Sequence, residues 1–250
     1  MTTVLQLGNR TLTGEEIIPL LASYKILPQL LCESIIDQAI ASHSCMPEET
    51  ASACQQFYQQ WELTDDAQRQ AWMARYGMNQ EHLELLATRS LRVAKFKEAT
   101  WGHKLESYFL QRKGQLDRVV YSLILTNDKW IANELYFRIK EGEQIFAELA
   151  RQYSEGSEAQ MGGLIGPVEL CTLPPNLAQM LYTSQPGQLW EPLAFGEGIA
   201  IVRLEKIIPA QFNESMRQRL LNEQFEAWFQ EQLKQLPHTD RIWMGTATNR

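Results

Sequence analysis

Residues 146–166 constrain the fold more than any other stretch of this 250-residue chain. An apolar run at helical spacing, carried by Phe146, Leu149 and Tyr153, stops at the polar sequence Ser-Glu-Gly. A small polar loop follows, and a glycine pair then leads into a short apolar segment. The order predicts a helix, a polar loop, a glycine pair and a buried strand.

The surrounding segment, residues 114–207, combines strand and helix patterns. Runs of β-branched and apolar residues predict strands, and capping and glycine signals bound the helices between them. Only a tight turn joins the last two strands, so the sheet must be partly antiparallel. We therefore expect an α+β unit. Its predicted strands lie at 119–125, 189–193 and 199–207, and its predicted helices at 128–142, 143–153 and 176–181.

Residues 13–110 have helical patterns and no convincing strand. Thr13, followed three residues later by Glu16, is a capping box that predicts a helix start. Pro28 predicts a kink or a new first turn. Residues 4–12 alternate weakly, which predicts a short extended lead-in. The fold class expected for the chain is thus α+β, with a mostly helical N-terminal domain.

A long amphipathic helix follows Pro209. Its apolar face needs a partner, and we expect the helical N-terminal domain to provide it because the sheet unit is already packed. The predicted division is a helical module at 1–113, a sheet domain at 114–207, a helix completing the N-terminal module at 208–236, and a tail at 237–250.

Composition and charge exclude several classes of function. The chain is 44% hydrophobic and carries a net charge of −7, which argues against nucleic acid as the main partner. Residues 114–206 carry seven basic and twelve acidic residues, which disfavours acidic ligands there. The apolar stretch 17–31 is interrupted by Pro19 and Lys25 and cannot span a bilayer. With no signal-peptide pattern and four cysteines, a reducing, cytoplasmic location is expected.

Five short pieces within residues 114–207 resemble the parvulin-type peptidyl-prolyl isomerases, the PpiC or rotamase domain family. No single piece is specific, but their order and spacing are hard to obtain by chance. The flanking helices are similar to SurA-like and PrsA-like folding factors, in which helices before and after the isomerase domain form one module. The five pieces are Phe-Ala-Glu-Leu-Ala at 146–150, Tyr-Ser-Glu at 153–155, Gly-Gly-Leu-Ile-Gly at 162–166, Pro-Gly-Gln-Leu at 186–189 and Gly-Ile-Ala-Ile-Val at 198–202.

The resemblance implies rotation about an X–Pro bond without a covalent intermediate. Typical members pair two sheet histidines, near an Asp or Cys, beside an apolar pocket for the proline ring. By this resemblance the first histidine position falls on Ser122, give or take one residue, the second falls on Ala200, and the Asp or Cys position falls on Gly156. The chain's four histidines all lie outside 114–207.

The apolar part of the family site is retained. The pocket positions, usually Leu, Met and Phe, fall on Ile165, Leu173 and Leu177. Trp190 follows a Pro-Gly turn at the expected groove edge. The resemblance therefore implies a proline-binding groove with the polar catalytic constellation substituted.

Other reactive residues have simpler explanations. His43, Cys45 and Cys54 cluster in the sequence, but they lack a fourth ligand and match no zinc spacing, so packing explains them better. Cys171 has no basic neighbour to depress its pKa and is interpreted as inert. Ser122 lacks the surroundings of a nucleophile elbow. We predict no metal and no cofactor.

The expected function is that of a folding factor that binds unfolded or extended proline-containing polypeptide, with catalysis weak or lost. Two alternatives stay open: a true prolyl isomerase, and a non-enzymatic adaptor dedicated to one precursor or secretion partner. A homodimer is also left open, and no membrane span or nucleic acid is expected.

Overall fold

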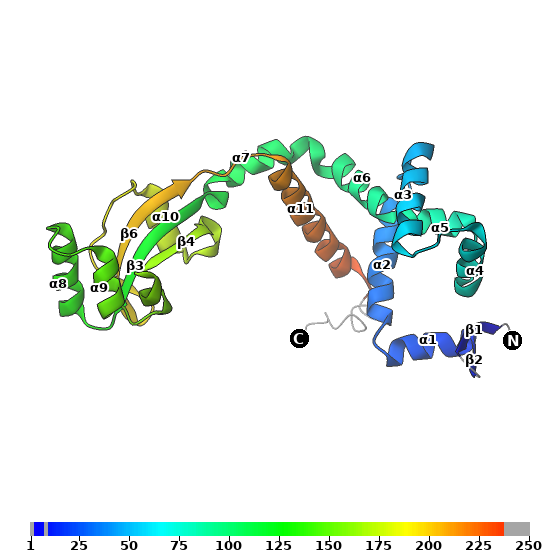
Figure 1. The fold of residues 1–250 in the computed structure, drawn as a ribbon, viewed down its shortest axis with the longest axis horizontal. Helices are drawn as coiled ribbons and strands as arrows, with labels where there is room; N and C mark the ends of the chain where they lie inside the picture. Colours follow the sequence, from blue (N-terminus) through cyan, green and yellow to red (C-terminus); the bar gives the residue numbers. More distant parts are fainter. Residues whose placement is uncertain (1–2, 8–9, 238–250) are drawn as a thin grey trace. The chain divides into compact units, whose positions relative to one another are not determined.

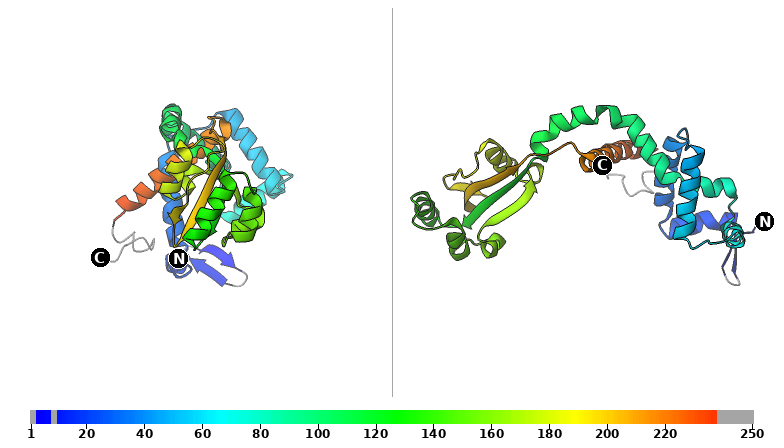
Figure 2. Two further views of the ribbon diagram at one scale, coloured as in Figure 1. Left: turned by 90° about the vertical axis from the view of Figure 1, so that its left-hand side faces the viewer. Right: turned by 45° about the horizontal axis from the view of Figure 1, so that its top comes forward.

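The computed structural model describes residues 3–7 and 10–237, so most of the predicted tail at 237–250 lies outside the described residues. These residues form two compact units, one up to Leu105 and again from Arg217, the other from Glu106 to Met216. Both are visible in Figure 1 and, from two further directions, in Figure 2. The combination of a helical unit with a small antiparallel sheet confirms the α+β prediction.

The helical unit begins with two paired antiparallel strands, where the sequence predicted only an extended lead-in. Two of its helices start at the signals named above. Thr13 and Glu16 form the predicted capping box, and Pro28 lies in the first turn of a new helix rather than in a kink. The elements are β1 (Thr3–Leu7), β2 (Arg10–Thr13), α1 (Gly14–Ser23), α2 (Leu27–Ile40), α3 (Pro47–Gln60), α4 (Asp66–Tyr76), α5 (Gln80–Ala87), α6 (Arg89–Trp101), η1 (Gly102–Lys104) and α11 (Glu214–Gln235).

The long C-terminal helix α11 packs on α6 of the helical unit, as the sequence predicted. The ring centres of Phe96 and Trp228 lie 5.0 Å apart, and those of Phe96 and Phe225 lie 6.3 Å apart. Lys97 Nζ lies 4.4 Å from the centre of the Phe225 ring. Such aromatic and cation–π contacts add to the stabilisation from buried apolar area. The C-terminal helix α11 therefore completes a unit whose other helices lie in the N-terminal part of the chain.

The second unit contains a four-stranded antiparallel sheet with the strand order β4-β3-β6-β5. The predicted boundary at Gly114 falls inside α7, the helix that leads into β3. The elements are α7 (Leu105–Leu116), β3 (Arg118–Thr126), α8 (Lys129–Lys140), α9 (Phe146–Tyr153), η2 (Ser157–Met161), β4 (Leu164–Glu169), η3 (Leu170–Thr172), α10 (Pro175–Thr183), β5 (Leu193–Phe195) and β6 (Gly198–Ile208).

The strand predicted at 189–193 is wrong in its position. Only an isolated bridge joins Leu189 to Arg203, and β5 begins at Leu193. Pro192 has no backbone N–H to donate to a ladder, which is the physical reason for the interruption. Trp190 still donates its backbone N–H to the Val202 carbonyl at 2.9 Å, so the segment follows β6 without forming a regular strand.

Helices cover both faces of this sheet (Figure 1). One face, here called the helix face, packs against α8 and α9 through a buried cluster that includes Ile124, Phe146 and Ile201. The other, here called the pocket face, packs against α10 through a cluster that includes Ala200 and Leu177. The side chains of each central strand alternate between the two clusters.

Gly163 brings β4 close to α9 and the central strand. Its φ is +80°, and a Cβ atom built there would lie 2.5 Å from the Leu123 carbonyl oxygen and 3.0 Å from the Ala150 Cβ. A side chain at this position would therefore meet both backbone strain and a clash with backbone atoms.

We predict that Gly163→Ala lowers the free energy of unfolding of this unit by about 2–4 kcal/mol, from strain and overpacking together. Gly187→Ala is the matched control, because its φ is +87° and nothing lies within 4 Å of the Cβ position. It should cost only about 1 kcal/mol. Amide hydrogen exchange of β3 and β6 measures both, and equal losses in the two variants would contradict the steric argument.

Candidate functional site

The register between β3 and β6 decides whether Ser122 and Ala200, which the resemblance assigns to the family's two histidines, can meet. Leu125 is paired with Ala200, whereas Ser122 is paired with Arg203. Ala200 is fully buried in the cluster on the pocket face. Ile124, two residues after Ser122, packs on the helix face. Since side chains alternate along a strand, Ser122 and Ala200 lie on opposite faces of the sheet, and the structure does not bring them together.

Ser122 belongs to a polar cluster on the helix face. Its hydroxyl donates to Glu205 Oε1 at 2.6 Å, and Arg203 Nε donates to the same oxygen at 2.8 Å. The Arg203 guanidinium also lies 5.0 Å from the centre of the Phe146 ring. The buried hydroxyl is thus satisfied by a carboxylate that an arginine neutralises. This arrangement stabilises the contact between the sheet and α9, a role that sequence reasoning missed.

The predicted pocket residues converge on the pocket face. Leu177 of α10 is a buried member of this cluster, and Ile165 of β4 and Leu173, which follows η3, pack against it as partly buried residues. Leu177 is only 1% exposed, so it forms the floor of this surface. Ile165 is paired across the sheet with Tyr121, whose ring is also buried there.

Gly156 lies in the loop that leads from α9 to η2, beside the end of β3. The Ser154 hydroxyl accepts the Leu125 backbone N–H at 2.9 Å and donates to Glu158 Oε1 at 2.5 Å. The Glu155 backbone N–H donates to the Leu125 carbonyl at 2.8 Å. These bonds hold the loop against the strand that carries Tyr121 and Ser122.

Trp190 is half-buried and held by two hydrogen bonds. Besides its backbone bond to Val202, its indole Nε1 donates to the Ser184 hydroxyl at 2.7 Å. The hydroxyl in turn donates to the Met180 carbonyl of α10. The indole therefore fixes the segment before β5 against α10.

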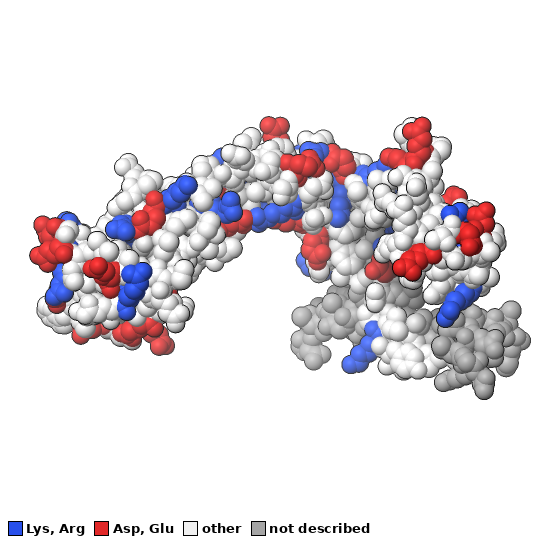
Figure 3. All heavy atoms as spheres, in the orientation of Figure 1, with Lys and Arg blue, Asp and Glu red and all other residues white. Residues whose placement is uncertain are grey.

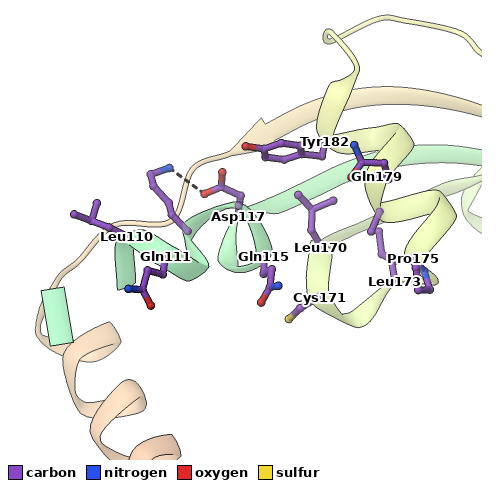
Figure 4. Close-up of a pocket in the computed structure, with 13 residues that line it drawn as sticks. Leu110, Gln111, Gln115, Asp117, Leu170, Cys171, Leu173, Pro175, Gln179 and Tyr182 are labelled. Atoms are coloured by element: carbon purple, nitrogen blue, oxygen red, sulfur yellow. Dashed lines mark hydrogen bonds and ion pairs between the residues drawn. The ribbon is translucent and has the colours of Figure 1, made fainter. Parts of the chain in front are cut away.

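A separate groove of about 800 Å³ lies between α7, η3 and α10 (Figure 4). Leu173, Ala178 and Tyr182 line one side of it, and the Lys113–Asp117 ion pair with an Nζ–Oδ1 distance of 3.2 Å lies in its wall. Of the four predicted pocket residues, only Leu173 reaches it. The groove also includes Cys171, which is exposed.

The other reactive residues lie in ordinary packing environments. The His43 ring meets the Phe96 ring edge-on at 5.6 Å, and Cys54 is buried beside Met73 and Leu83. Burial raises the pKa of the Cys54 thiol above its usual value. Within residues 3–7 and 10–237, no group of three His, Cys, Asp or Glu side chains is arranged to hold a metal ion.

Two further properties of the described residues bear on function: the distribution of charge on the surface and the hydropathy of the helices. On the face seen in Figure 3, basic and acidic side chains are interspersed over each unit. Among the helices in the described part of the chain, none combines the length and apolar composition needed to cross a membrane.

The pocket face therefore offers an apolar surface over the buried floor at Leu177, with Ile165 and Leu173 packed against it. Such a surface can hold a proline ring and remove water from the preceding amide. Rotation about that amide has a barrier of about 18–20 kcal/mol because resonance gives the C–N bond double-bond character. A site lowers this barrier only by binding the twisted amide better than the planar forms.

The fold and the site define a parvulin-like α+β domain joined to a helical module. Residues 126–206 match the PPIC-type PPIASE domain, the Rotamase family. This part of the chain is therefore a parvulin-type domain, and the resemblance predicted from the sequence is confirmed. Its helical module resembles those of the SurA and PrsA proteins.

Two relatives support this assignment, and one solved structure shares the fold. Chaperone SurA of Shewanella sp. (strain MR-7) is 34% identical over 122 residues, which cover 44% of this chain and 28% of the relative. Foldase protein PrsA of Caldanaerobacter subterraneus subsp. tengcongensis is 24% identical over 143 residues, 56% of this chain and 46% of the relative. The chain thus matches less than half the length of either. The structure of PrsA from Bacillus cereus shares the fold, with a TM-score of 0.51, 18% identity and coverage of 100% of this chain and 93% of that one.

We predict that Ser122→Ala destabilises the second unit by about 1–3 kcal/mol, the cost of losing a buried hydrogen bond to a charged group. Peptide binding on the pocket face should be unchanged, because Ser122 faces α9. Hydrogen exchange of β3 measures the first effect, and a peptide titration measures the second. Loss of peptide binding in a folded variant would contradict this assignment of Ser122 to the helix face.

A second prediction concerns Tyr121. Burial, and to a smaller extent the Glu158 carboxylate, raise the pKa of its phenol above the usual value. In the unfolded chain the phenol has its ordinary pKa of about 10. Its contribution to stability is therefore fully present below about pH 10 and is lost as the pH rises through the higher folded-state pKa.

Thermal unfolding followed by circular dichroism at about pH 9 to 11 tests this linkage. The wild-type melting temperature should fall more steeply over this range than that of Tyr121→Phe, which has no proton to lose. Parallel curves for the two proteins would show that the Tyr121 phenol does not contribute.

Proposed function

We propose that this protein is a folding factor that binds extended, proline-containing segments of unfolded polypeptide on the pocket face of its parvulin-type domain. The observation that carries the proposal is the apolar surface formed by Ile165, Leu173 and the buried floor at Leu177, in a domain that matches the PPIC family. The similarity to SurA, named a chaperone, and to PrsA, named a foldase, supports the same role. Residues 114–207 are the proposed client-binding domain.

We further propose that isomerisation by this domain is slow. The positions that resemble the family's histidine, histidine and Asp or Cys hold Ser122, Ala200 and Gly156. These substitutions favour, as a second candidate, an adaptor that binds its client without catalysis. Binding of a proline peptide with no faster exchange between its cis and trans NMR signals would select the adaptor, and binding with faster exchange would select the enzyme.

Ile165→Ala should weaken the binding of a proline-containing peptide about five- to tenfold, because it removes about 1–1.4 kcal/mol of apolar contact. Leu164→Ala is the control. Ile165 is paired with Tyr121, which lies on the pocket face, whereas Leu164 is paired with Ser122, which lies on the helix face. Leu164 is also 48% exposed, so its truncation should leave the pocket face unchanged. An NMR titration of each full-length variant measures the affinity. Equal affinities for the two variants would contradict binding on the pocket face.

Two further expectations stay predictions. We propose a cytoplasmic location from the four cysteines of the sequence, and cell fractionation tests it. A homodimer is tested by sedimentation of the full-length protein at several concentrations.

A further inference from the structure

Gly156 has no side chain, yet the space that a side chain would occupy there is filled. A Cβ atom built on Gly156 would lie 2.1 Å from Glu158 Oε2, 2.4 Å from Oε1 and 2.6 Å from Cδ. The carboxylate of Glu158 therefore occupies the position toward which a side chain at residue 156 would project. The loop turns between these residues, at the start of η2, and this turn brings the carboxylate back.

The Glu158 carboxylate is held in this place by the central strand. One of its oxygens accepts the Ser154 hydroxyl at 2.5 Å, and that hydroxyl is fixed by the Leu125 backbone N–H at 2.9 Å. Glu158 is half-buried, so it is neither a freely rotating surface acid nor sealed inside the core. A carboxylate in these surroundings is less screened by water than one on the open surface.

The loop that holds this carboxylate is anchored beside the pocket face: Ser154, which donates to Glu158, accepts the N–H of Leu125, and Leu125 is paired with Ala200 and packs against the pocket-face cluster. Its charge contributes to the raised pKa of Tyr121, whose ring lies in the pocket-face cluster with Ala200 and Leu177. Tyr121 is paired across the strands with Ile165, at the border of the proposed proline surface. The loop that holds the carboxylate and the proposed proline surface thus both border β3, at Leu125 and at Tyr121 respectively.

We propose that Glu158 supplies the acidic group of the prolyl site, in the place that the side chain of residue 156 would otherwise take. This inference rests on the proposed function, since it concerns the same site. In the planar X–Pro amide, resonance places negative charge on the carbonyl oxygen, and this charge decreases as the bond twists. A carboxylate directed at that oxygen raises the energy of the planar forms more than that of the twisted form. It therefore lowers the barrier, with no bond formed and no proton moved.

The test uses three full-length variants: Glu158→Gln, Glu158→Ala, and the double variant Gly156→Asp with Glu158→Ala. Glu158→Gln keeps an oxygen that can accept the Ser154 hydroxyl but removes the charge. In the double variant, Gly156 has an extended backbone (φ −90°, ψ 169°) that any residue adopts. Removing Glu158 also opens the space around its Cβ position, so the aspartate places a carboxylate near the original one.

The readout is the rate of cis–trans exchange of a short peptide with one central X–Pro bond, measured by NMR together with its dissociation constant. We expect Glu158→Gln and Glu158→Ala each to lose at least fivefold of the catalysed exchange while affinity changes less than twofold. The double variant should regain at least half of the lost rate.

If the Glu158→Gln variant catalyses cis–trans exchange at the wild-type rate, the inference is overturned, because the Glu158 carboxylate would then only stabilise the loop. Absence of recovery in the double variant would overturn it as well. A wild-type protein that binds the peptide without accelerating exchange overturns this inference but leaves the binding function in place. A wild-type protein that binds no proline peptide overturns the proposed function and, with it, the role of Glu158.

Discussion

The antiparallel pairing of β3 with β6 is the constraint on which the second unit depends. Because Leu125 is paired with Ala200 and Ser122 with Arg203, every side chain of the two strands is assigned to one face. The helix face receives the polar contacts of Ser122, and the pocket face receives Ala200 within an apolar cluster. A slip of one residue would exchange the two faces, so the pairing decides where a proline could bind.

The loop between α9 and β4 depends on the same strand. Ser154 and Glu155 hydrogen-bond to Leu125, and the Leu123 N–H donates to the Gly163 carbonyl at 2.8 Å. The close approach of Gly163 to β3 and α9 is possible because glycine has no Cβ. The central strand therefore holds both ends of the loop that carries Glu158. This explains how a loop residue can have a defined place in the site.

Much of the fold could be predicted from local signals. The capping box at Thr13, the end of the strand region near residue 207 and the packing of α11 on the helical unit follow from capping residues and apolar periodicity. The strand predicted at 189–193 was misplaced, since β5 begins only at Leu193, because periodicity alone did not weigh the missing N–H of Pro192. The resemblance assigns Ser122, Ala200 and Gly156 to three family positions, but it could not say on which face of the sheet Ser122 and Ala200 lie.

The sequence by itself determined that this chain carries a parvulin-type domain with flanking helices, and that the domain has no histidine. Motifs and periodicity are properties of neighbouring residues, so they can be read from the chain. Only the tertiary structure decided that Ser122 and Ala200 lie on opposite faces and that Glu158 fills the space beside Gly156. Strand register and a turning loop create such neighbours through space, and spacing along the chain does not encode them.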